Sequence, residues 1–309
     1  MKLIHYLVIN RLCIALGIAM SQSMLITMPA LAGDNNHNVT YRYEAGVHYS
    51  NRDTDSSINL KSLGTGIQIF TSAIAYQDAP YAEASFLDRS SFFTAEINTV
   101  DVDFNSVTAG GSLKGELMGI GFVYADKQNP FVAGITVKSA NADNTIHGVD
   151  VNFRLDVIDY LFGYYLNNHS LLSMLVQQND IELDTNNTRQ VDINTTDYRI
   201  HFKNVLPLAS SRFVNLEAGY ASIDENNNRN NTEISISGDY YPEHISGIGA
   251  RVGFNSGDNH SDEGTAYEIR LVKFLTKRTQ VKARFDKFVA DQANNDKDEI
   301  RVSLSHRFR

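Results

Sequence analysis

The chain has 309 residues with 27 Lys and Arg against 36 Asp and Glu, and its net charge of −9 argues against nucleic acid as a partner. Its only cysteine, Cys13, lies in the first 32 residues, so residues 33–309 have neither a disulfide nor a thiolate metal site. No later apolar run has the length of a transmembrane helix, so a membrane-spanning form must be a closed β-barrel.

Residues 1–32 have the features of a cleaved signal peptide. Lys2 and Arg11 supply positive charge, an apolar stretch follows Arg11, and the triplet 30–32 reads Ala-Leu-Ala. The other interpretation is a membrane anchor, but Arg11 and the polar residues 21–23 interrupt the apolar run. Cleavage would leave a single domain, 33–309, with 25 basic and 36 acidic residues and a net charge of −11.

Apolar and polar residues alternate in short runs from Val39 to Phe308. Examples are 281–285 (Val-Lys-Ala-Arg-Phe) and 300–304 (Ile-Arg-Val-Ser-Leu). Side chains of a strand point to opposite faces with period two, so each run has one apolar and one polar face. So many charged strand positions favour an all-β transmembrane barrel, with apolar residues toward lipid and charged residues toward a water-filled lumen.

Fourteen antiparallel strands are predicted, with counts of 12 and 16 as alternatives. The predicted strands are 39–50, 60–71, 91–104, 115–125, 130–140, 147–166, 170–183, 191–204, 212–224, 232–241, 245–255, 264–275, 278–290 and 297–308. Short connections such as 126–129 and 167–169 alternate with longer polar ones such as 224–231, which matches the short turns and long outer loops of bacterial outer-membrane barrels.

Three segments do not follow this simple scheme. The apolar face of 147–166 changes parity at Val157-Ile158, which predicts a bulge or a hidden turn. Segment 72–90 is too long for a short turn, and 80–89 within it predicts a short helix or part of an extra hairpin. Segment 104–114, with Gly110 and Gly111, is the candidate for a loop that folds inward and constricts the lumen.

The C-terminal strand places Val302, Leu304 and Phe308 on one face, with Phe308 one residue from the end. This pattern resembles the signal that outer-membrane barrels present to their assembly machinery, although Arg309 follows the aromatic. The signal peptide, the strand rhythm, Phe308 and the segment 80–89 (Pro-Tyr-Ala-Glu-Ala-Ser-Phe-Leu-Asp-Arg) together resemble the porin-like families of Gram-negative bacteria. That resemblance implies passive diffusion of small hydrophilic solutes through the outer membrane, without a cofactor.

Strand parity predicts which charged residues line the lumen. On 39–50, for example, Val39, Tyr41, Tyr43, Ala45 and Val47 are expected to face lipid. The predicted pore-lining residues are Arg42, Glu44, Glu96, Lys138, Arg199, His201, Lys203, Glu217, Arg251, Glu268, Arg270, Lys282, Arg284, Asp286, Glu299 and Arg301, with Arg307 also inward. Basic residues outnumber acidic ones in the second half of this set, which favours a weak anion preference.

Other chemistry has little support in the sequence. The nine histidines lack metal-binding spacing, and no nucleophile elbow is found, so neither a metal site nor catalysis is expected. Acidic loop residues Asp53, Asp55, Asp258, Asp262 and Glu263 are expected to be solvated, the other reading being divalent ions that bridge lipopolysaccharide. The expected partners are outer-membrane lipid, lipopolysaccharide, the assembly machinery and small solutes. A homo-oligomer is also possible, because strand parity does not distinguish an outer wall that contacts lipid from one that packs against another copy of the chain.

Three alternatives to a channel follow from the same residues. Interior Arg–Glu pairs can fill the lumen of a non-conducting structural or surface-interaction barrel. An outer-membrane hydrolase requires clustered Asp, His or Ser at the barrel rim, and no such cluster is found in the sequence. An exported soluble β-protein would bury its apolar faces inside.

Overall fold

A computed structural model describes the chain over 40–54, 58–75, 80–106, 109–146, 149–185, 188–208, 211–225, 229–257, 263–291 and 296–309. The predicted signal peptide, Val39 and the loop residues Asp55, Asp258 and Asp262 lie outside these ranges. The alternating sequence forms long strands there because each strand can satisfy its backbone hydrogen bonds only with the strands beside it.

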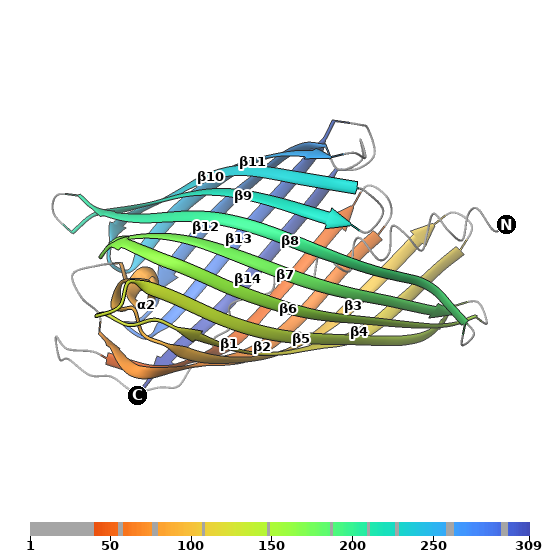
Figure 1. Ribbon diagram of the computed structural model, residues 1–309, viewed down its shortest axis with the longest axis horizontal. Helices are drawn as coiled ribbons and strands as arrows, with labels where there is room; N and C mark the ends of the chain where they lie inside the picture. The colour runs from red at the N-terminus through yellow and green to blue at the C-terminus, as the bar shows by residue number, and fades with distance from the viewer. Residues whose placement is uncertain are drawn as a thin grey trace.

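The strands close into a single antiparallel barrel of fourteen strands (Figure 1). They are β1 Thr40–Thr54, β2 Ile58–Ala75, β3 Phe92–Ser106, β4 Ala109–Tyr124, β5 Phe131–Ile146, β6 Val149–Asn167, β7 Ser170–Thr185, β8 Thr188–Pro207, β9 Phe213–Glu225, β10 Arg229–Glu243, β11 Ser246–Gly257, β12 Gly264–Phe274, β13 Thr279–Ala290 and β14 Lys297–Phe308. The predicted class and strand number are confirmed, and the alternatives of 12 and 16 are wrong.

Pairing of the first and last strands closes the barrel. β1 and β14 are in register from Tyr43 opposite Phe308 to Thr54 opposite Lys297. Every other strand pairs with its neighbours in sequence, so no connection crosses the sheet. Closure removes the unpaired strand edges that an open sheet would expose.

The two ends of the barrel differ. We call the end that holds the turns 168–169, 244–245 and 275–278 and the C-terminus the short-turn end, and the opposite end the far end. The connection between β2 and β3 also lies at the short-turn end, and contains the 3-10 turn η1 (Tyr81–Glu83) and the helix α2 (Ala84–Asp88). The predicted short helix in 80–89 is therefore present.

Along β9–β14, and near the short-turn end of β2–β8, the outer surface of the barrel is a belt of exposed apolar side chains. Ile234 and Ile236 on β10 are 62% and 61% exposed, and Phe162, Tyr164 and Leu166 form a similar row on β6. The residues between them point inward and include many charged side chains. The sidedness expected for a membrane barrel thus holds along this belt.

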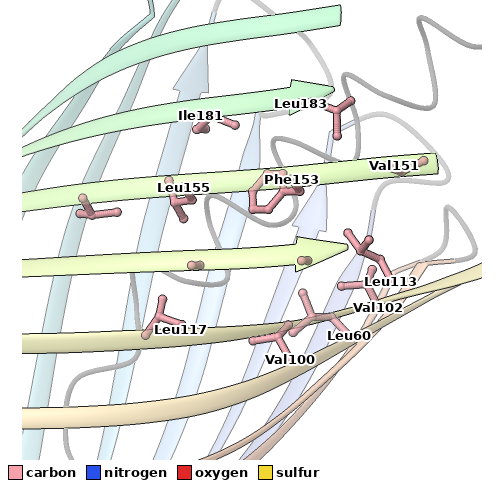
Figure 2. Close-up of a cluster of buried hydrophobic side chains, with 13 residues drawn as sticks. Leu60, Val100, Val102, Leu113, Leu117, Val151, Phe153, Leu155, Ile181 and Leu183 are labelled. Atoms are coloured by element: carbon pink, nitrogen blue, oxygen red, sulfur yellow. The ribbon is translucent and has the colours of Figure 1, made fainter. Parts of the chain in front are cut away.

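Toward the far end, strands β2–β8 have the opposite sidedness. Thirteen buried apolar residues gather on the inner face of β2–β7 (Figure 2), and the partly buried Ile193 of β8 packs against them. They are Leu60, Val100, Val102, Leu113, Leu117, Ala140, Ala142, Val151, Phe153, Leu155, Val157, Ile181 and Leu183. We call these residues the inner apolar cluster.

The change of apolar face at Val157-Ile158 has no bulge beneath it. β6 pairs with β5 without a register shift from Val149 to Tyr164, and with β7 from Val151 to Tyr165. The bulge or hidden turn predicted at this point is therefore wrong. The backbone is regular, and the apolar residues change from the inner face to the outer face along one continuous strand.

Candidate functional site: the barrel interior

Two of the cavities inside the described part of the barrel are lined largely by polar and charged side chains. The first has a volume of about 1070 Å³ and reaches from the helix α2 to the far-end halves of β10–β14. The second, of about 320 Å³, lies beside η1 and is lined mainly by β1–β3 and β8–β14. Cavities of this size can hold many water molecules or a small solute.

Charges around the first cavity are balanced. Nine basic and nine acidic residues lie around it. The basic ones are Arg52, Arg89, Lys138, Arg199, Arg251, Arg270, Arg284, Lys287 and Lys297, and the acidic ones are Glu96, Asp159, Asp197, Glu217, Glu233, Glu268, Asp286, Asp298 and Glu299. The excess of basic residues expected from sequence is thus absent from the larger cavity.

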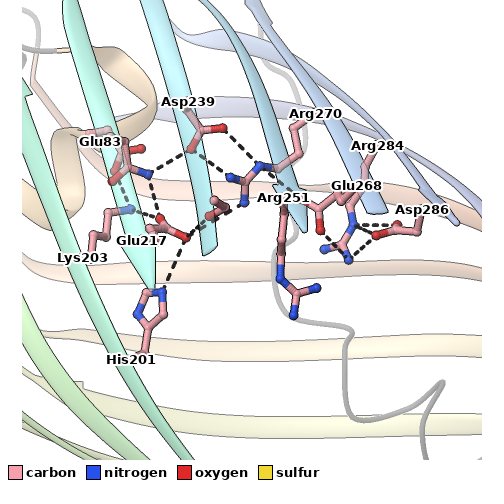
Figure 3. Close-up of polar contacts among 12 residues, drawn as sticks. Glu83, His201, Lys203, Glu217, Asp239, Arg251, Glu268, Arg270, Arg284 and Asp286 are labelled. Atoms are coloured by element: carbon pink, nitrogen blue, oxygen red, sulfur yellow. Dashed lines mark hydrogen bonds and ion pairs between the residues drawn. The ribbon is translucent and has the colours of Figure 1, made fainter. Parts of the chain in front are cut away.

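Neighbouring strands β12 and β13 form the centre of an ion-pair network (Figure 3). Glu268 is 2% exposed and lies between two guanidinium groups, with Oε1 3.1 Å from Arg270 Nε and Oε2 2.9 Å from Arg284 Nη2. Arg284 also pairs with Asp286 at 2.6 Å, and Arg270 reaches Asp239 at 3.1 Å. Each interior charge in this group therefore has an opposite charge within hydrogen-bonding distance.

A second part of the network joins β8, β9 and η1. Lys203 Nζ lies 2.7 Å from Glu83 Oε2 and 3.3 Å from Glu217 Oε1, and His201 Nε2 lies 3.5 Å from Glu217. The amide of Asn215 donates to Glu217 at 2.7 Å and to Asp239 at 2.9 Å, which links the two parts. The charged interior is thus held together from β8 to β13.

The second cavity has a local excess of positive charge. Six basic and four acidic residues line it: Arg52, Lys203, Arg270, Lys282, Arg284 and Arg301, against Glu83, Glu217, Asp239 and Glu299. Within the described part of the chain, Lys282 has no carboxylate within ion-pair distance. This cavity is therefore the part of the interior most suited to attract an anion.

Residues 80–91, which we call the inward segment, lie across the short-turn end of the barrel. Glu83 is buried and accepts a hydrogen bond of 2.8 Å from the Tyr241 hydroxyl, besides its ion pair with Lys203. The Tyr165 hydroxyl donates to the Phe86 carbonyl at 3.0 Å. These contacts attach the segment to β6, β8 and β10, none of which is adjacent to the two strands that it connects.

Arg89 fixes the end of α2. Its backbone φ of 49° lies in the left-handed region that usually favours glycine at a helix C-terminus. Its guanidinium donates to the Asn167 carbonyl at 2.6 Å and lies 4.0 Å from the centre of the Tyr165 ring. The side chain therefore binds the turn between β6 and β7, and this contact accounts for an arginine at a strained position.

Arg307 joins the inward segment to the barrel seam. Its Nε lies 2.8 Å from Glu44 Oε2 on β1, and its Nη1 donates to the Tyr81 carbonyl at 2.7 Å. Both charged side chains are 3% exposed. A buried pair of this kind is costly to break, because removal of one partner leaves the other charge unpaired away from water.

Most residues predicted to line the pore lie around the two cavities. The first cavity includes Glu96, Lys138, Arg199, His201, Glu217, Arg251, Glu268, Arg270, Arg284, Asp286 and Glu299, and the second adds Lys203, Lys282 and Arg301. Glu44 is buried against Arg307. Whether these residues contact a permeating solute stays a prediction.

Two assignments at the start of β1 are reversed. Arg42, expected in the lumen, is exposed, and its guanidinium donates to the Thr71 carbonyl at 2.8 Å. Tyr41, expected to face lipid, is fully buried, with its ring 5.5 Å from that of Phe70 and 4.6 Å from the Arg307 guanidinium. The inward segment supplies apolar contacts at this end, where Phe70, Ile74 and Ala84 enclose Tyr41.

The described residues of segment 104–114, which are 104–106 and 109–114, belong to the barrel wall and do not fold into the lumen. The β3–β4 pairing continues through it as far as Ser106 opposite Ala109. The prediction of a constricting loop there is wrong, because the backbone hydrogen bonds of both strands are satisfied within the wall. The inward segment 80–91 occupies the interior instead.

Several interior residues were missed by the parity argument. They are Arg52, Glu83, Arg89, Asp159, Asp197, Glu233 and Asp239. Glu233 and Asp239 alternate with the outward Ile234, Ile236 and Tyr240 of β10, so the same parity rule could have found them. The helix signal at 80–89 gave no indication that Glu83 and Arg89 lie inside the barrel.

In the described ranges, no group of three or more His, Cys, Asp or Glu is arranged to hold a metal ion. No helix in the same ranges is long and apolar enough to cross a membrane.

Comparison with known proteins supports the fold through structure alone. No family model and no curated sequence matches the chain. The outer membrane protein Omp33 of Acinetobacter baumannii is similar with a TM-score of 0.56 and 14% identity, over 87% of this chain and 99% of that one. The toluene transporter TodX of Pseudomonas putida has a TM-score of 0.51 and 9% identity, over 85% of this chain and 88% of that one.

A third similar structure is CdiB from Acinetobacter baumannii, with a TM-score of 0.50 and 7% identity, over 86% of this chain and 60% of that one. The chain therefore has the porin-like β-barrel fold found in outer-membrane proteins. At these identities the likeness concerns the fold.

Proposed function

We propose that the chain is an outer-membrane channel of a Gram-negative bacterium, exported with a cleaved signal peptide, through which small hydrophilic solutes diffuse passively. The observation that carries this proposal is the large charged cavity inside a closed barrel with an apolar outer belt. An apolar belt suits lipid, and a polar interior suits water and ions. A barrel of fourteen strands is intermediate in width. Side chains fill the interior of barrels with about 8 strands, whereas barrels of 16–18 strands leave an aqueous channel.

The inward segment lies across the proposed path. It crosses the short-turn end, and Glu83, Phe86 and Arg89 border the cavities there. In the orientation of bacterial barrels this end faces the periplasm. A solute that has entered from outside must therefore pass between α2 and the strands that bind it.

A weak anion preference is retained as part of the proposal, with a different origin from the one that sequence suggested. The larger cavity is balanced in charge, whereas the smaller one beside η1 has six basic residues against four acidic ones. Selectivity would therefore arise near the inward segment, where Lys282 and Arg301 line the path. Phe308, which stacks on Tyr43 at 5.6 Å, remains the proposed assembly signal.

A second candidate function is a non-conducting structural or surface-interaction barrel. The specific observation in its favour is the pairing of interior charges, since Glu268, Arg270, Arg284 and Glu217 each contact an opposite charge. A fully paired interior attracts mobile ions less strongly than a set of free charges. The two functions differ in whether ions cross the barrel.

Single-channel recording in planar bilayers separates these functions. We expect small conductance steps from the parent protein and larger steps from Glu83→Ala/Arg89→Ala, because this variant loses the contacts of the inward segment to Lys203, Tyr241 and Asn167. Lys61→Ala is the matched control, since Lys61 is on the outer surface and should leave conductance unchanged. Absence of steps from both the parent and the double variant would establish the non-conducting barrel.

A further inference from the structure

The outer face of β2–β8 is strongly charged near the far end. The side chains that point outward there include nine acidic and three basic ones, which alternate with the inner apolar cluster. They are Asp101, Asp103, Glu116, Asp143, Asp150, Asp156, Asp180, Glu182 and Asp192, with Lys61, Lys114 and Arg154. Such a density of charge is incompatible with contact to lipid acyl chains, where each charged side chain carries a large penalty.

Contacts among these residues are those of a water-exposed surface. Lys61 pairs with Asp103 and Lys114 with Asp101, both at 3.4 Å, and these lysines are 47% and 73% exposed. On β6 and β7, Asp156 is directly opposite Asp180 in the register. Like charges opposite each other repel, and water and its ions reduce that repulsion far more than lipid can.

Both faces of the sheet change character at the same level. On β5 the inner face changes from Lys138 to Ala140, and the outer face changes from Val137 to Asn141. At the same level on β6, the inner face changes from Asp159, which lies 3.1 Å from Lys138, to Val157. The outer face of β6 changes from Ile158 to Asp156. A bulge would shift the faces of one strand, but here the register is unbroken across the change.

A change on the outer face alone would indicate a local charged patch. The simultaneous change on both faces indicates a change of surroundings, because an apolar interior with a charged exterior is the arrangement of a protein wall in water. The inner apolar cluster then supplies the core that holds this part of the sheet together (Figure 2).

We propose that the bilayer boundary crosses β2–β8 at the level of Lys138 and Asp159, and that the far parts of these strands stand in water as a one-sided wall. On β6 the wall comprises 149–157, which at ~3.3 Å per residue extends about 30 Å along the strand. β9–β14 have no comparable extension, since outward apolar residues such as Phe254 and Val289 continue almost to their far ends. This inference rests on the proposed membrane location.

Cysteine accessibility in the native membrane tests the boundary. Asp156→Cys and Asp180→Cys represent the wall, and Phe162→Cys and Ile200→Cys represent the belt. Each variant is treated with a membrane-impermeant maleimide, and the parent chain, which loses Cys13 with the signal peptide, gives the background labelling. Heat-modifiable gel mobility verifies that each variant is folded. We expect full labelling at 156 and 180 and protection at 162 and 200.

The outcomes separate this inference from the proposed function. If 156 and 180 are protected as well as 162 and 200, the boundary lies farther out and the inference is overturned, while the membrane channel stands. If all four positions are labelled in folded protein, the barrel is not in a bilayer, and the proposed function fails together with the wall. Quenching of a fluorophore at each position by brominated acyl chains gives the complementary measurement, with the opposite pattern expected.

Discussion

The belt and the wall of this barrel are built from the same strands with opposite sidedness. In the belt, Phe162 and Ile200 point out and ion pairs such as Lys138–Asp159 lie inside; in the wall, Leu155 points in and Asp156 points out. The backbone pairing is continuous between them. The alternation of apolar and polar residues therefore predicts that a strand forms. Which face of the strand must be apolar depends on whether lipid or water surrounds that part of the barrel.

The two regions also differ in what stabilises their interiors. The belt interior depends on ionic pairs that must all be satisfied, because an unpaired buried charge is costly. The wall interior depends on apolar burial, worth roughly 25 cal/mol per Å² removed from water. A charge introduced on the inner face should therefore destabilise the wall, and a charge introduced on the outer face should destabilise the belt.

The largest expected effect is that of a charge in the wall interior. Leu155 is 1% exposed within the inner apolar cluster, so Leu155→Asp should lower the free energy of unfolding by about 4 kcal/mol or more. Equilibrium urea unfolding of the refolded protein in detergent or liposomes measures this loss. Asn141→Asp is the matched control, because the same carboxylate on the outer face lies opposite Arg154 and should cost little.

An intermediate effect is expected from a charge on the belt. Ile200 is 48% exposed on the outer face, and Ile200→Lys should destabilise the barrel in a bilayer by about 2–4 kcal/mol. The same substitution at Thr196, four residues farther along the outer face of β8 and beyond the proposed boundary, should cost well under 1 kcal/mol. Equal losses at the two positions, measured by unfolding from liposomes, would contradict the placement of the boundary.

The smallest expected effect concerns ion preference at the short-turn end. Lys282 lines the smaller cavity, so Lys282→Met should shift the reversal potential in a salt gradient slightly toward cation permeation. Lys273→Met serves as the control, because Lys273 is an exposed residue that lines neither of the two cavities. An unchanged reversal potential would show that ions do not pass close to Lys282.

The architecture could be predicted from sequence because it depends on local periodicity. All fourteen strands, the closed barrel and the helix within 80–89 follow from alternation, turns and chain length. The parity argument also brought Arg251, Glu268, Arg270 and Arg284 to the interior. The strands and these inward positions follow from the period of two and the assumption of one apolar and one polar face.

Predictions failed where that assumption changes along the chain. The parity change at Val157-Ile158 suggested a bulge because the apolar face was taken to point outward throughout, whereas the backbone there is regular. Tyr41 was placed in lipid for the same reason. The course of the inward segment depends on contacts of Glu83 and Arg89 with strands far away in the sequence, and no local pattern contains that information.

Arg307 links the inward segment to the barrel wall, and it lies in the last strand of the chain. The inward segment, whose Tyr81 carbonyl accepts a hydrogen bond from Arg307, is synthesised more than 200 residues earlier. The carboxylate partner of Arg307 is Glu44, which belongs to the first strand. This latch can therefore close only after the final strand has docked against the first. A truncated polypeptide that ends before β14 would lack this contact to the inward segment, so the short-turn end of the barrel is completed in the last step of biogenesis.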